Sequence, residues 1–178
     1  MRGKGSVMTT RKRTGSLLFV TALALLLVSC GYQLVREKGI FGGDITSLYL
    51  SVFKNSTYEP HISEYVTSAF SQELLTTGLF TLNKENSDGY LQGTISDIRI
   101  VPVSLNIAGL AIEKNVTLQL DVALYRKNGT FIKRWGLSDT ETYRVDNIDA
   151  EEYNKNDAIT RLAARMARRF SSFLFVDY

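Results

Sequence analysis

Residues 116–124 read Val-Thr-Leu-Gln-Leu-Asp-Val-Ala-Leu and decide the fold class, because apolar side chains occupy every second position. Side chains of a strand point to opposite faces in turn, so this alternation predicts a β-strand with one buried face. Asn128-Gly129 follows and predicts a type I′ hairpin turn, whose two central residues both take positive φ. A two-residue loop there places Val122 opposite Trp135, so the apolar faces of two antiparallel strands match.

Shorter apolar runs upstream predict three more strands, at residues 47–53, 79–83 and 90–101, with Pro102 closing the last of them. The segment that follows, up to Asn115, is apolar for a connection. It is either a loop that meets a partner or a lipid, or another strand.

Two stretches have the spacing of three and four residues that predicts an amphipathic helix. The first starts at Glu59-Pro60, since proline is tolerated in a first turn, and ends at Gly78 as a C-cap. The second runs from about Asp149, which we expect to be the N-cap. The apolar positions of this final helix are Ile159, Leu162, Ala163, Met166, Phe170, Phe173 and Leu174. The predicted fold class is α+β, with two helices packed on one face of a mostly antiparallel sheet of about four strands.

The first 29 residues have the layout of a secretory signal, with five basic residues followed by the uncharged run 17–28. This run has 12 residues, whereas a helix that spans a bilayer needs about 20. Leu27-Val28-Ser29-Cys30 resembles the bacterial lipobox and contains the single cysteine of the chain. We therefore predict a lipoprotein signal peptide at 1–29, cleavage before Cys30, and lipidation of Cys30.

The rest of the chain is predicted to be a lipidated tether at 30–44 and a single domain at 45–178. Removal of the five basic residues of the leader changes the formal charge from +3 to −2. Because the mature chain is slightly acidic, its charge gives no support for a nucleic-acid partner.

The sequence lacks the usual components of an active site. His61 is the single histidine, and its place in the first turn of a predicted helix favours a solvent-facing role. With Cys30 assigned to lipidation, metal sites built from His and Cys are excluded, as are Cys–His and Ser–His dyads with local partners. We expect no enzyme, no metal and no cofactor.

A basic cluster surrounds the predicted hairpin turn and consists of Arg126, Lys127, Lys133 and Arg134, among Tyr125, Phe131 and Trp135. Cations beside aromatic rings can hold an amphiphile with a phosphate head and an acyl tail. The alternative is a solvated tip whose lysines discourage pairing at a sheet edge. A second basic group lies on the final helix, at Arg161, Arg165, Arg168 and Arg169, and spacing favours a plain outer face over a phosphate-binding one.

Several motifs in this order resemble one known family. They are Cys30-Gly31-Tyr32-Gln33-Leu34, the run 52–60 leading into a helix, Asp88-Gly89-Tyr90-Leu91-Gln92-Gly93-Thr94-Ile95, and the Ala-rich final helix. Over essentially the whole mature chain the sequence resembles the LptE family of lipopolysaccharide-assembly lipoproteins.

The resemblance implies a lipoprotein anchored to the periplasmic side of the cell outer membrane through its lipid. It also implies a complex with an LptD-like β-barrel, in which the lipoprotein acts as plug and assembly factor while lipopolysaccharide passes to the outer leaflet. The resemblance assigns no lipid-contacting basic residue in this chain, so composition alone makes the hairpin cluster the candidate contact for lipopolysaccharide. Its residues are Arg126, Lys127, Lys133 and Arg134. The alternative is a lipoprotein accessory, a pilot or stabiliser, of another envelope machine.

Overall fold

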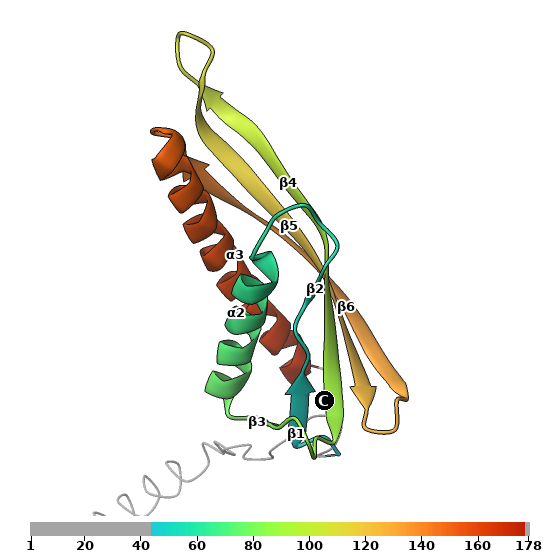
Figure 1. The fold of residues 1–178 in the computed structure, drawn as a ribbon. Coiled ribbons are helices and arrows are strands. Elements are labelled where there is room, and N and C mark those ends of the chain that lie inside the picture. The colour runs from blue at the N-terminus through green and yellow to red at the C-terminus, as the bar shows by residue number, and fades with distance from the viewer. Residues whose placement is uncertain (1–43, 177–178) are drawn as a thin grey trace, which may run out of the picture. The chain divides into compact units, whose positions relative to one another are not determined.

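The computed structural model describes residues 44–176 of the chain. The predicted signal peptide, Cys30 and the tether up to residue 43 lie outside the described residues. A six-stranded mixed sheet and two helices make up the described part, which confirms the predicted α+β class (Figure 1).

Three long antiparallel strands form the body of the sheet, and three short parallel strands extend one side of it. The order is β3-β1-β4-β5-β6, and β2 pairs separately with β4. The strands are β1 (Ser47–Leu50), β2 (Lys54–Asn55), β3 (Thr81–Leu82), β4 (Gly89–Leu105), β5 (Ala111–Arg126) and β6 (Phe131–Arg144). The sheet has more strands than the four expected, and two of the short ones contain only two residues each.

Both helices lie on one face of the sheet, as predicted, and α2 packs beside α3 (Figure 1). The first helix, α2 (Ile62–Thr77), ends at Gly78, whose positive φ of 64° and N–H bond to the Leu75 carbonyl confirm the expected C-cap. Its start differs from the prediction, because Pro60 precedes the helix and His61 is the N-cap residue, with φ 59°.

The second helix, α3 (Ile148–Val176), already includes Asp149 as its second residue, so Asp149 is not the N-cap. Its capping residue is Asn147, whose side-chain oxygen accepts a hydrogen bond from the Ala150 N–H at 2.8 Å. The N-cap prediction was therefore wrong, since asparagine two residues earlier supplies the acceptor that the first turn needs.

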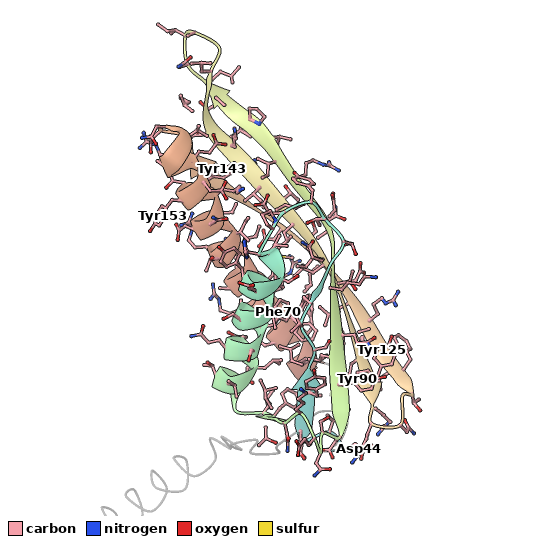
Figure 2. The ribbon with its side chains drawn as sticks, viewed as in Figure 1. Asp44, Phe70, Tyr90, Tyr125, Tyr143 and Tyr153 are labelled. Atoms are coloured by element: carbon pink, nitrogen blue, oxygen red, sulfur yellow. The ribbon has the colours of Figure 1, made fainter. Side chains whose placement is uncertain are left out.

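The core lies between the helices and one face of β4, β5 and β6. The apolar positions predicted for α3 are buried or pack against the core, and Leu118, Leu120, Val122 and Leu124 are buried on β5. Phe70 of α2 lies at the centre of this layer, with ring centroids 4.8 Å from Phe53 and 5.4 Å from Phe170 (Figure 2).

The predicted strand 47–53 was partly wrong, because β1 ends at Leu50. Alternation from Leu48 through Leu50 predicts that Val52 is also buried, whereas Val52 is 69% exposed and Phe53 is 1% exposed. The Phe53 ring fills the space above Gly93, where an added Cβ would lie only 2.2 Å from it. The chain therefore leaves the regular strand path so that this ring can enter the core.

Pro102 does not close its strand, contrary to the prediction. β4 continues to Leu105. The segment 102–115, for which a loop and a strand were the alternatives, forms the end of β4, a turn at 106–110 and the beginning of β5. Within the described residues, no strand pairs with β4 on its other side after Ile95. A residue without an N–H is tolerated at such an edge.

Candidate functional site

The turn between β5 and β6 carries the predicted basic cluster. The Gly129 N–H donates to the Arg126 carbonyl at 2.9 Å, and the Arg126 N–H donates to the Thr130 carbonyl at 2.8 Å. Gly129 has φ 86°, but Asn128 has no positive φ, so the type I′ prediction was wrong. The loop is a three-residue turn with glycine in the left-handed region, followed by a bulge.

The bulge explains why the strand register was nevertheless predicted correctly. Tyr125 lies opposite Phe131, and the next pair is Leu124 with Lys133, so β6 contributes one extra residue. This residue offsets the longer loop, and Val122 lies opposite Trp135 as expected.

The structure does not gather the four predicted cations on one surface. Lys133 lies opposite the buried Leu124, on the face that carries the helices, with its Nζ 5.6 Å from the centre of the Trp135 ring. Arg134 is the next residue of the strand and therefore projects from the opposite face, which we call the outer face of the sheet.

The other two cations lie at the hairpin end itself. Arg126 forms an ion pair with Asp44, with 3.3 Å between Nη2 and Oδ2. Lys127 is exposed in the turn, and its backbone N–H donates to the Asp88 carbonyl at 2.8 Å. Asp44, the first described residue, is thus held next to the β5–β6 hairpin.

An aromatic row lies on the outer face beside Arg134. The rings of Tyr90 and Tyr125 stack at 5.0 Å with an interplanar angle of 11° (Figure 2). Phe131 meets Tyr125 edge-on at 5.7 Å. Phe131 is 53% exposed. Arg134 lies opposite Ala123, one outward-facing position along β5 from Tyr125.

This outer-face site, defined as Arg134 with Tyr90, Tyr125 and Phe131, has the chemistry of a surface that binds an anionic amphiphile. The guanidinium can donate two parallel hydrogen bonds to a phosphate, while the rings offer apolar surface to a chain. Sequence reasoning missed Tyr90, because it comes from β4 and only the strand pairing brings it to Tyr125.

The basic residues of α3 behave differently from the plain outer face that was expected. Arg165 binds three groups of β6, namely the Asp139 carboxylate at 2.6 Å, the Glu141 carboxylate at 2.7 Å and the Thr140 carbonyl at 2.9 Å. Arg161 also binds Glu141, at 3.0 Å. Arg165 thus binds one backbone carbonyl on the free edge of β6, and both arginines join the helix to the carboxylates of this strand.

These contacts change the acidity of the groups involved. The hydrogen bond from Arg165 lowers the pKa of Glu141. Burial opposes ionisation of Asp139, but its hydrogen bonds from Arg165 and from the Thr140 N–H lower the pKa overall. The bonds to Asp139 and Glu141 raise the pKa of Arg165. All three groups therefore stay charged at neutral pH, as a structural clamp requires.

A groove of about 450 Å³ lies between α2 and α3, with Ser68, Gln72 and Thr160 among its lining residues. His61 does not line this groove. Its side chain is exposed, as predicted, with its Nδ1 3.8 Å from the Glu64 carboxylate.

Between residues 44 and 176 the structure contains no cluster of His, Cys, Asp and Glu suited to a metal ion. In the same part of the chain, neither helix is both long and apolar enough to cross a membrane.

Comparison with known proteins gives a family match and several structural likenesses. The family model LptE, described as lipopolysaccharide-assembly, matches residues 45–174. Among curated proteins, none matches this sequence.

Three solved structures that resemble this chain are 8–17% identical to it in sequence, so the likeness shows the fold alone. A protein of Caulobacter crescentus described as a lipoprotein is 17% identical, with a TM-score of 0.50 over 69% of this chain and 87% of its own. A hypothetical protein of Chlamydia trachomatis is 8% identical, with a TM-score of 0.50 over 71% of this chain and 94% of its own. The rare lipoprotein B of Shewanella oneidensis is 14% identical, with a TM-score of 0.48 over 73% of this chain and 99% of its own.

Proposed function

The chain belongs to the LptE family of lipopolysaccharide-assembly proteins, which is non-enzymatic, and from that premise we propose that it is the lipoprotein partner of an LptD-like β-barrel. In this role it plugs the barrel, assists its assembly and supports the transport of lipopolysaccharide to the outer leaflet. The observation that carries the proposal is the family match over residues 45–174, which spans all six strands and nearly all of α3.

We propose that the protein is anchored on the periplasmic side of the outer membrane through lipidated Cys30. The lipobox pattern at residues 27–30 supports this, and similar folds occur in proteins described as lipoproteins. Mass spectrometry of the mature protein should find a terminus at residue 30 that carries fatty chains, and Cys30→Ser should abolish them. A mature terminus elsewhere, or one without acyl chains, would remove the anchor from the proposal.

We further propose that lipopolysaccharide contacts the outer-face site, where Arg134 faces the same side as the aromatic row. Of the four cations predicted from sequence, Arg134 is supported by these neighbours. Lys127 lies close enough to the same end to add charge, whereas Arg126 and Lys133 have partners in Asp44 and the Trp135 ring.

The central experiment is purification of the full chain from its own cells in mild detergent. We expect a large β-barrel to copurify and to be identified by mass spectrometry as an LptD homologue, and depletion of the chain to reduce surface lipopolysaccharide. Recovery of the monomer alone, with surface lipopolysaccharide unchanged after depletion, would instead favour an accessory role in another envelope machine.

A further inference from the structure

The distal end of the β4–β5 hairpin, residues 101–112, exposes more apolar surface than any role in the core explains. We call it the apolar tip. It contains no charged residue, and all of its valine, leucine and isoleucine side chains are exposed. They are Val101 (39%), Val103 (50%), Leu105 (59%), Ile107 (109%), Leu110 (65%) and Ile112 (41%).

The apolar tip is a two-stranded extension that the rest of the fold does not cover. The pairing of β5 with β6 begins at Glu113 and Arg144, so the tip lies beyond the last residue of β6. Figure 1 shows the hairpin extending past the first turn of α3. An isolated two-stranded hairpin is only marginally stable in water, so an exposed apolar one requires a reason other than folding.

The exposed backbone of the tip decides between lipid and protein as its occupant. The edge of β4 opposite β5 has no partner strand from Asp97 to Leu105 in the described part of the chain. Hydrocarbon cannot satisfy the N–H and C=O groups of an open edge, and such edges do not occur in the lipid-facing core of a bilayer. A protein surface can supply these hydrogen bonds, so the tip fits a protein partner and not the hydrocarbon of a bilayer.

The area of the tip distinguishes between two kinds of partner. One is a second copy of this chain joined tip to tip, and the other is a protein that also contacts the rest of the domain. The six exposed side chains offer roughly 600 Å² of apolar surface. A stable interface buries about 800 Å² on each partner, so two tips joined to one another would fall short. The tip must therefore be one part of a larger contact.

We propose that the apolar tip docks into an uncharged cleft of the β-barrel partner, which covers its side chains and pairs with its open β4 edge. This inference rests on the proposed function, because the barrel must also engage the body of the domain. The described chain enters at Asp44 beside Arg126, the residue that ends β5, whereas the tip lies at the start of β5. Asp44 and the tip therefore lie near opposite ends of one strand.

The test uses the full chain in its own cells, with a photoreactive benzoylphenylalanine in place of Ile107. We expect an adduct with the LptD-like barrel, identified by mass spectrometry. We also expect Leu105→Asp with Leu110→Asp to reduce the copurified barrel by roughly tenfold or more, because the docked hairpin would bury unpaired charges. The thermal midpoint should stay unchanged, since both side chains contact solvent in the free protein.

The matched control is Leu75→Asp on α2, where the replaced side chain is 57% exposed. Equal loss of the barrel in control and tip variants would overturn the inference, as would a tip variant that retains the barrel while the wild type binds it. An Ile107 adduct that joins two copies, or tip variants that lose only binding to phospholipid vesicles, would overturn it in favour of self-association or a membrane. Absence of the barrel from wild-type preparations would instead refute the proposed function on which the inference rests.

Discussion

At the scale of single residues, Asp88 joins the beginnings of β1 and β4. One carboxylate oxygen accepts hydrogen bonds from the N–H groups of Thr46 and Ser47 and from both of their hydroxyls, at 2.8–3.0 Å. These bonds, led by the one from the Ser47 hydroxyl, lower the pKa of Asp88 to about 2. A carboxylate with a lowered pKa contributes stability that is fully present above its unfolded pKa and lost as the pH falls toward the folded value.

We therefore predict that Asp88→Asn lowers the free energy of unfolding by about 1 kcal/mol at pH 7. The difference between wild type and variant should shrink as the pH falls from about 4 to about 2, where Asp88 itself becomes protonated. Urea unfolding at several pH values measures this difference. The control is Glu85→Gln, an exposed carboxylate in the same loop, which should leave the stability at pH 7 unchanged. A constant difference across this pH range would contradict the assignment.

Gly93 shows the opposite constraint, in which a side chain must be absent. A Cβ at this position would lie 2.2 Å from the ring of Phe53, which is itself packed against Phe70. We predict that Gly93→Ala lowers the free energy of unfolding by about 1–3 kcal/mol, because the ring must move out of a filled core. Phe53→Leu should recover part of this loss in the double variant. Gly136→Ala, which meets nothing within 4 Å, is the control and should change stability by less than about 0.5 kcal/mol.

At the scale of elements, Arg165 adds polar contacts between α3 and β6 to the apolar packing of Trp135 against Phe170. Its guanidinium binds two carboxylates and one carbonyl of the edge strand. Because the Arg165 side chain is 40% exposed, we predict a modest loss of roughly 1–2 kcal/mol for Arg165→Ala. Arg165→Lys should recover little of it, since an ammonium lacks the planar fork that reaches all three acceptors.

The measurement is urea unfolding at low and high salt, and the Arg165→Ala deficit should be smaller at high salt because exposed charges are screened. The matched control is Arg168→Ala, one turn further along the same helix. If both variants prove equally stable, the contact with β6 is not what holds the edge. Increased self-association of Arg165→Ala alone would agree with a β6 edge that has become open.

The sequence predicted correctly those elements whose apolar residues recur at one regular spacing, either every second residue in a strand or every three to four residues in a helix. Alternation in β5 and the spacing of apolar residues in α3 held because one face of each packs on the core. The register of β6 held because any shift by one residue would have turned Trp135 to the outer face. The prediction failed at Val52 because the contact of Phe53 with Gly93 overrides the alternation of the strand. It failed at Pro102 because a proline, which has no N–H, is tolerated at an unpaired strand edge.

At the scale of the whole molecule, the predicted basic cluster was close in sequence but not in space. Lys133 and Arg134 are adjacent in one strand, so their side chains point to opposite faces of the sheet. This separation could have been predicted from the sequence, because side chains alternate between faces along any strand. Tyr90 could not be found in this way, because the stacking with Tyr125 exists only through the pairing of β4 and β5. The candidate site is therefore a property of the assembled sheet.

The two proposed binding surfaces lie near opposite ends of β4, which has 17 residues and thus spans about 55 Å. Sites separated by more than about 10 Å without shared partners contribute independently. We predict that Arg134→Glu weakens the binding of labelled lipopolysaccharide to the full chain in mild detergent without reducing the copurified barrel. Leu110→Asp should do the reverse.

The matched control for Arg134→Glu is Arg99→Glu, the same charge change at an exposed residue of β4 that has no aromatic row beside it. In a variant that combines Arg134→Glu with Leu110→Asp, each loss should equal that of the corresponding single variant, because neither surface needs the other to be formed. If either single substitution lowers both lipopolysaccharide binding and barrel recovery, the two surfaces are coupled. The sheet would then act as one binding element, because a charge at one end of β4 would have changed the contacts made at the other.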